Sequence, residues 1–68
     1  MFIKIYSRDL GLLDVAIKVL YRSKVLADYG PVVPTRPGFY QQIKVKCDEP
    51  TLKVMLKKNF KKEVIVVK

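Results

Sequence analysis

In two stretches of the sequence, side chains that could bind a polyanion alternate with apolar side chains. In residues 2–7 (FIKIYS) and 39–47 (FYQQIKVKC), basic, aromatic and amide side chains fall on every second position. Lysine ammonium groups neutralise phosphates, and aromatic rings stack on bases of any identity. A solvated sheet face with lysines for solubility would show the same pattern, and the surface could equally meet protein. The outward residues are Lys4, Tyr6, Tyr40, Gln42, Lys44 and Lys46.

Further basic residues lie in the predicted turns. Arg36, next to Thr35 in the turn before the second stretch, is the strongest single candidate for RNA contact, because a guanidinium matches the geometry of phosphate. The competing interpretation is an ordinary solvent-exposed arginine of a turn. Arg8 follows residues 2–7. Lysines that flank the end of the second predicted helix could attract a phosphate backbone, or simply complement that helix end in solvent. These lysines are Lys57, Lys58, Lys61 and Lys62.

The sequence lacks the combinations of residues that catalysis or metal binding usually needs. The chain has no histidine, and Cys47 is its only cysteine, which excludes an internal disulfide and argues against zinc. The six carboxylates are scattered, without a pair at a spacing useful for acid–base chemistry. We therefore expect no enzyme, no metal, no cofactor and no small-molecule substrate. The carboxylates are Asp9, Asp14, Asp28, Asp48, Glu49 and Glu63.

Composition favours a folded domain with an anionic partner. Fourteen Lys and Arg against six Asp and Glu give a net charge of +8 over 68 residues, and 50% of the residues are hydrophobic. No apolar run of about 18 residues exists, so we expect no membrane partner. We expect no signal peptide either, and the single cysteine favours a reducing compartment. A single domain (1–68) of this size is marginally stable alone, which favours a partner.

Capping and periodicity predict two helices. Asp9 is placed to cap a helix that runs to about Lys24, and Asp48 to cap a second helix with Pro50 in its first turn. The apolar residues of both recur at helical spacing. The predicted apolar faces are Leu13, Ala16, Ile17, Leu20 and Tyr21 in the first helix, and Leu52, Met55 and Leu56 in the second.

The remaining segments predict four strands. The strands are residues 2–7, about 28–34, 39–47 and the final EVIVVK (63–68). Ile3, Ile5, Ile43, Val45 and Cys47 are predicted to point inward. The order β-α-β-β-α-β is that of an α+β ferredoxin-like split βαβ fold, with an antiparallel four-stranded sheet and two helices on one face.

The second strand is predicted to lie at a sheet edge, since strands one and three are central in this fold. An edge tolerates Pro31 and Pro34, whose missing N–H groups would face water. Pro37-Gly38 suits the centre of a type II turn, in which glycine supplies the positive φ.

Short motifs follow one another along the whole chain in a distinctive order. After the basic first strand and its turn come residues 30–35 (GPVVPT), a phenylalanine-led basic strand at 39–46, a helix with Leu52 and Met55, and the final EVIVV. This order resembles the small-subunit ribosomal protein ten family, called uS-ten. The turn and the leucine-leucine-aspartate sequence of that family match Ser7, Asp9, Leu12, Leu13 and Asp14.

The resemblance implies a structural component of the small-subunit head that functions in translation. Its partners would be small-subunit rRNA and neighbouring head proteins, typically three, nine and fourteen, and bacterial members also join a transcription antitermination complex. Two features depart from the family. The proline-threonine motif is one residue short, and the long basic hairpin is reduced to residues 35–39 (TRPGF). A reduced hairpin resembles the organellar members of the family more than the bacterial ones. The expected location is therefore a ribosome, and a mitochondrial ribosome rather than a bacterial one.

Two rival classes share the expected fold. An acylphosphatase needs an anion-cradling loop with an arginine and a water-positioning asparagine, but Asn59 is the only asparagine and Asp9 beside Arg8 would repel phosphate. A free-standing RNA-binding module of the RRM kind needs aromatics on both central strands. Tyr6 and Tyr40 keep this alternative open, although RPGFYQQIKVK matches the RRM octapeptide only at its start.

Overall fold

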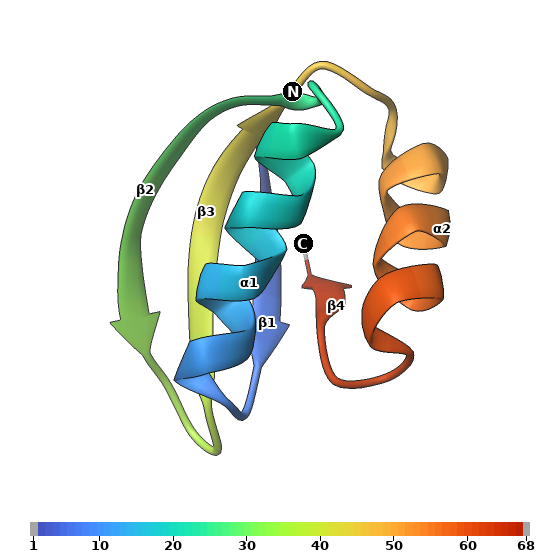
Figure 1. The fold of residues 1–68 in the computed structure, drawn as a ribbon. Coiled ribbons are helices and arrows are strands. Elements are labelled where there is room, and N and C mark those ends of the chain that lie inside the picture. Colours follow the sequence, from blue (N-terminus) through green and yellow to red (C-terminus); the bar gives the residue numbers. More distant parts are fainter. Residues whose placement is uncertain (1, 68) are drawn as a thin grey trace.

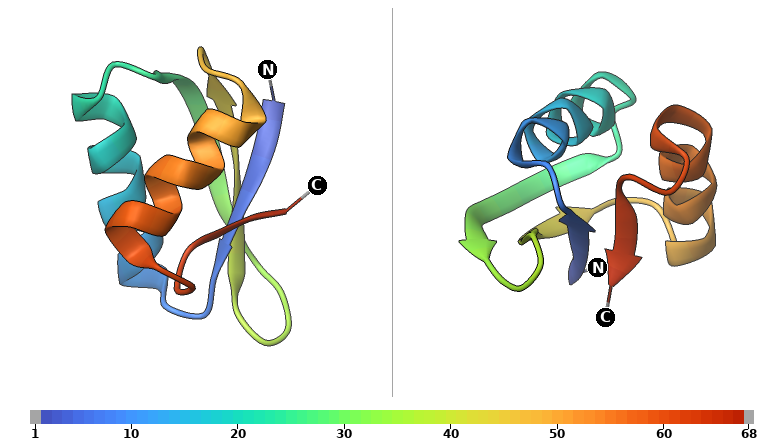
Figure 2. Two further views of the ribbon diagram at one scale, coloured as in Figure 1. Left: turned by 90° about the vertical axis from the view of Figure 1, so that its right-hand side faces the viewer. Right: turned by 90° about the horizontal axis from the view of Figure 1, so that it is seen from below.

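The computed structural model describes residues 2–67 and places four strands in one antiparallel sheet. The spatial order is β2-β3-β1-β4, and both helices cover the same face (Figures 1 and 2). This confirms the ferredoxin-like split βαβ fold, with β1 and β3 central and β2 at an edge. The elements are β1 (Phe2–Ser7), α1 (Leu10–Arg22), β2 (Leu26–Pro34), β3 (Phe39–Val45), α2 (Glu49–Phe60) and β4 (Ile65–Val67).

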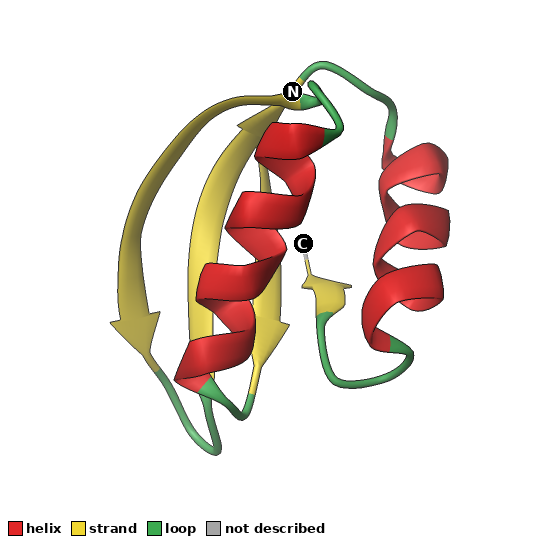
Figure 3. Ribbon diagram, in the orientation of Figure 1, coloured by secondary structure: helices red, strands yellow, loops and turns green. Residues whose placement is uncertain are grey.

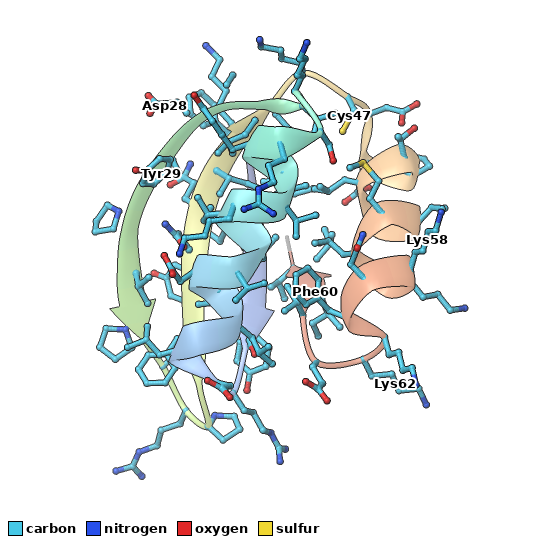
Figure 4. The ribbon with its side chains drawn as sticks, in the orientation of Figure 1. Asp28, Tyr29, Cys47, Lys58, Phe60 and Lys62 are labelled. Carbon is cyan, nitrogen blue, oxygen red and sulfur yellow. The ribbon has the colours of Figure 1, made fainter. Side chains whose placement is uncertain are left out.

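The core lies between the sheet and the two helices, where the inward side chains of the central strands contact the apolar faces of the helices. Phe60 extends the predicted face of α2 and lies between the helices in Figure 4. Tyr21 was predicted to be inward, but it is 73% exposed. Eight residues after Leu13, a helical position has rotated by about 80°, which carries Tyr21 off the buried stripe. The core residues include Ile3, Ile5, Leu13, Ala16, Leu20, Ile43, Val45, Leu52, Leu56, Phe60 and Val64.

Both predicted N-caps are confirmed. A carboxylate oxygen of Asp9 accepts a hydrogen bond from the backbone N–H of Gly11 at 2.9 Å, and one of Asp48 accepts from Thr51 at 3.0 Å. Helix α1 ends at Arg22, slightly earlier than predicted, because Lys24 adopts a left-handed conformation with φ of 62° that cannot continue a helix.

The edge strands differ from their predicted bounds. Strand β2 begins at Leu26, and its pairing with β3 shifts register between Tyr29 and Val32, a bulge that contains both Gly30 and Pro31. The buried Gln41 side chain donates a hydrogen bond to the Gly30 carbonyl at 2.8 Å. The carbonyl therefore has a hydrogen-bond donor at the point where the bulge interrupts the strand pairing.

Strand β4 is shorter than the predicted 63–68, spanning only Ile65–Val67. Val64 is buried, but it precedes the strand. Lys68, the last residue of the predicted strand, lies outside the described residues.

The β2–β3 turn is not the predicted type II turn. None of the described glycines has a positive φ, and the Arg36–Pro37 peptide bond is cis. The turn is closed by the Thr35 N–H, which donates to the Gly38 carbonyl at 2.8 Å. Gly38 is needed for a different reason. A Cβ there would meet the Ser7 carbonyl oxygen and lie 2.8 Å from the Arg8 Cα. The hairpin tip therefore packs directly against the β1–α1 turn, at the end of the sheet where Figure 3 also shows the α2–β4 loop.

Candidate nucleic-acid interface

The face of the central strands opposite the helices carries the predicted basic and aromatic residues. Cross-strand pairs on this face are Phe2 with Lys44, Lys4 with Gln42, and Tyr6 with Tyr40. Paired residues of antiparallel strands point to the same side, so all six share one surface. We call these six residues the open face.

Two lysines of the open face lie over its aromatic rings. The Lys4 ammonium nitrogen is 5.2 Å from the centre of the Tyr40 ring, and that of Lys44 is 5.6 Å from the Phe2 ring. At exposed sites such a contact is worth about 0.5–1 kcal/mol. Stacking a base on an aromatic ring is worth about 1–3 kcal/mol. A base can therefore displace the lysine from the ring, and the freed ammonium group can then contact a phosphate.

The hairpin brings further predicted residues to one end of the open face. A concavity of about 440 Å³ forms there, with Thr35, Arg36 and Pro37 from the turn on one side. This volume falls within the roughly 300–1,000 Å³ typical of small-ligand sites. Five sequence-predicted residues meet in this hairpin concavity, and none of the described residues that line it is an Asp or Glu. The lining residues are Lys4, Tyr6, Thr35, Arg36, Pro37, Tyr40, Ile65 and Val67.

The charge of the open face is uneven along the strands. At the end away from the hairpin, Asp28 of the edge strand pairs in register with Lys44. Its carboxylate accepts a hydrogen bond from the Tyr29 N–H at 2.8 Å. A carboxylate there opposes phosphate, so the field favours an anion at the hairpin end, near Arg36 and Lys4.

The other predicted RNA contacts lie apart from this surface. Arg8 and Lys62 border a different concavity of about 660 Å³, at the β1–α1 and α2–β4 turns, where Asp9 and Glu63 weaken any attraction for phosphate. Lys46 is exposed beyond the end of β3, and its backbone N–H donates to the Val25 carbonyl at 2.8 Å.

Lys61 and Lys62 lie at the end of α2, next to β4. The structure thus unites Lys4, Tyr6, Thr35, Arg36 and Tyr40, with Lys44 at the far end of the same face, but not the remaining four candidates.

Three apolar residues were not among the predicted site residues. Phe2 is 66% exposed on the open face, and Ile65 and Val67 are exposed walls of the hairpin concavity. The signal for Phe2 was present, since strand alternation places it on the same side as Lys4 and Tyr6. In the final strand, the run of aliphatic residues hides which side chains point outward.

Residues 2–67 contain no cluster of three or more His, Cys, Asp or Glu suited to a metal ion. None of the helices within this range is long and apolar enough to cross a membrane.

Cys47 was predicted to end the inward row of the third strand. It lies just beyond β3 instead, partly exposed against the core. Hydrogen bonding by the side chain and then the backbone of Thr51 lowers the pKa of Asp48, consistent with its capping role.

Comparison of the chain with protein-family models, with curated proteins and with solved structures finds no match. The resemblance to the ribosomal protein ten family therefore stays a prediction, and the geometry of the open face is the firmer basis for a function.

Proposed function

We propose that this chain binds single-stranded RNA through the open face. The observation that carries the proposal is the convergence of Tyr6 and Tyr40 with Lys4 and Arg36 around the hairpin concavity. Single-stranded RNA presents unstacked bases that pack on aromatic side chains, and sheets with aromatics on their central strands are a common platform for them. The net charge of +8 supports an anionic partner.

The proposed contacts divide into stacking and charge neutralisation. Tyr6 and Tyr40, directly paired across β1 and β3, supply adjacent ring surfaces for bases. Lys4 and Arg36 neutralise the flanking phosphates. This arrangement holds RNA with little sequence preference, because ring stacking tolerates any base and phosphate contacts carry no sequence information.

A matched pair of tyrosine variants tests the proposal. Tyr40→Leu removes a π-face but keeps an apolar side chain, whereas Tyr21→Leu makes the same change at an exposed position on α1. With fluorescein-labelled oligouridylate and anisotropy detection, Tyr40→Leu should weaken binding by about 5- to 150-fold, the equivalent of ~1–3 kcal/mol for one lost stack. Tyr21→Leu should bind like the wild type. Equal affinity for Tyr40→Leu and the wild type would refute stacking on the open face.

A place in the small ribosomal subunit is our second proposal. It rests on the sequence order that resembles the ribosomal protein ten family and on the shared βαββαβ topology. In that setting the open face and hairpin would meet small-subunit rRNA or a neighbouring head protein, in a mitochondrial ribosome. Sedimentation of a tagged copy from its native lysate tests this. Salt-resistant, nuclease-sensitive migration with the small subunit supports it, and recovery only at the top of the gradient rejects it in favour of a free-standing module.

A further inference from the structure

A second basic surface lies on the opposite side of the sheet from the open face, between α2 and β4. A groove of about 280 Å³ runs between the helix and the strand, with Leu56, Val64 and Val66 among its apolar lining residues. In the right-hand view of Figure 2, α2 lies on the outer side of β4, so the helix forms one wall and the strand the other. Four lysines rim the groove: Lys53, Lys57, Lys61 and Lys62.

The strand side of this groove is an edge without a neighbour. Within the described residues β4 pairs with β1 alone, through Lys4–Val67, Ile5–Val66 and Tyr6–Ile65. A strand directs part of its N–H and C=O groups to each side, so the outer side of β4 presents backbone groups for another strand to pair with.

The helix side of the groove is positively charged, because four lysines and no carboxylate are among the described residues that line it. The ion pair between Lys18 and Asp14 lies on α1, apart from these lysines. Glu63 directly follows Lys62 in sequence, but it lines the concavity at the β1–α1 turn rather than this groove. An incoming segment would therefore meet positive charge from the helix, apolar side chains at the base and a strand edge at its flank.

We propose that this groove binds an extended acidic peptide segment of a partner protein, which adds to the sheet beside β4 as a further strand. Main-chain pairing supplies affinity in this mode, and alternate side chains supply specificity. Val66 points to the helix side while Ile65 and Val67 point to the open face. The added strand should carry the same alternation, with Asp or Glu toward the lysines of α2 and aliphatic residues toward Ile65 and Val67.

Other occupants fit these features less well. A second copy of the chain would bring another +8 of charge against the lysines. RNA would neutralise the lysines, but it would leave the N–H and C=O groups of the β4 edge without strand pairing. An acidic strand matches both the lysines and the backbone groups of the β4 edge, and its aliphatic residues would contact Ile65 and Val67 on the other face. This proposal is independent of RNA binding by the open face.

The test uses the full chain and a fluorescein-labelled probe peptide of sequence EVEVEVEVE, with binding followed by anisotropy. Lys57→Glu reverses a charge on the groove rim. Lys58→Glu reverses its neighbour, which extends along the outer side of α2 and does not line the groove (Figure 4). Both are exposed, so both variants should fold, as far-ultraviolet circular dichroism will verify. We expect Lys57→Glu to weaken binding by about five- to tenfold and Lys58→Glu by less than about twofold.

Two further measurements separate strand addition from general charge attraction. The peptide EVEPEPEVE keeps the charge but loses backbone donors, and it should bind at least about tenfold more weakly if the peptide pairs as a strand. Backbone amides within Ile65–Val67 should gain protection from hydrogen exchange when EVEVEVEVE binds. Equal weakening by Lys57→Glu and Lys58→Glu, equal binding of the proline peptide, or displacement of the peptide by oligouridylate would each overturn the proposal.

Discussion

Replacing Gly38 with alanine tests how the hairpin is held against the rest of the sheet. The added Cβ would meet the Ser7 carbonyl oxygen and the Arg8 Cα, at 2.8 Å from the latter. Both are backbone atoms of the β1–α1 turn, so no side chain can rotate to make room. Overpacking of this kind costs about 1–3 kcal/mol, and we expect the upper part of that range. A domain of this length has a total stability of roughly 3–10 kcal/mol. The loss would therefore be a large fraction of the total.

Urea unfolding followed by circular dichroism measures this effect. Gly30→Ala is the matched control, because a Cβ there would lie 3.6 Å from the Gln42 carbonyl oxygen, an ordinary contact, and Gly30 has no positive φ. We expect the urea midpoint to fall clearly for Gly38→Ala and to stay near the wild-type value for Gly30→Ala. If Gly38→Ala unfolds within about 0.5 kcal/mol of the wild type, the range for ordinary surface changes, the hairpin does not pack on the β1–α1 turn as described.

Three further changes probe the cap, the core and the bulge. The pKa of Asp48 is lowered by the hydrogen bonds it accepts, so its stabilising contribution is full above its unfolded pKa of about 3.8 and is lost as pH falls through the lower folded value. Asp48→Asn should therefore be less stable than the wild type at neutral pH, with the difference shrinking in acid unfolding curves. Leu52→Ala empties a fully buried position and should cost about 2–5 kcal/mol in urea unfolding. Val54→Ala, at a 67% exposed position on the same helix, should change stability by less than about 0.5 kcal/mol. Gln41→Leu leaves the Gly30 carbonyl at the bulge without its donor and should cost about 1–3 kcal/mol, and a stability equal to the wild type would show that the hydrogen bond contributes nothing.

Local rules were sufficient to predict most of the fold. The caps at Asp9 and Asp48 depend on neighbouring residues alone, and the structure confirms them. The same holds for the inward Ile3 and Ile5 of β1 and the inward Ile43 and Val45 of β3, although Cys47 lies beyond the strand. The order of the elements was then compatible with only a few sheet topologies, because crossover connections are right-handed. Strand β4 was predicted too long because a run of aliphatic residues does not distinguish a paired strand from the core-filling Val64 before it.

The candidate site was predictable only where it lies on regular strands. Alternation placed Lys4, Tyr6 and Tyr40 on one surface, and the same rule would have added Phe2. The position of Arg36 could not be obtained in this way. It depends on the close approach of the hairpin to the β1–α1 turn, a contact between segments that are distant in sequence. The separation of Arg8 and Lys62 from the open face is likewise a result of loop paths, which no local pattern specifies.

The most direct test of RNA binding by the open face is a chemical-shift map of the ¹⁵N-labelled chain during titration with oligouridylate. The account predicts that the largest shifts fall on Lys4, Tyr6 and Tyr40 and on the hairpin at Arg36, with the outer surface of α1 unaffected. Shifts confined to the lysines of α2, or no shifts at all near physiological salt, would contradict it.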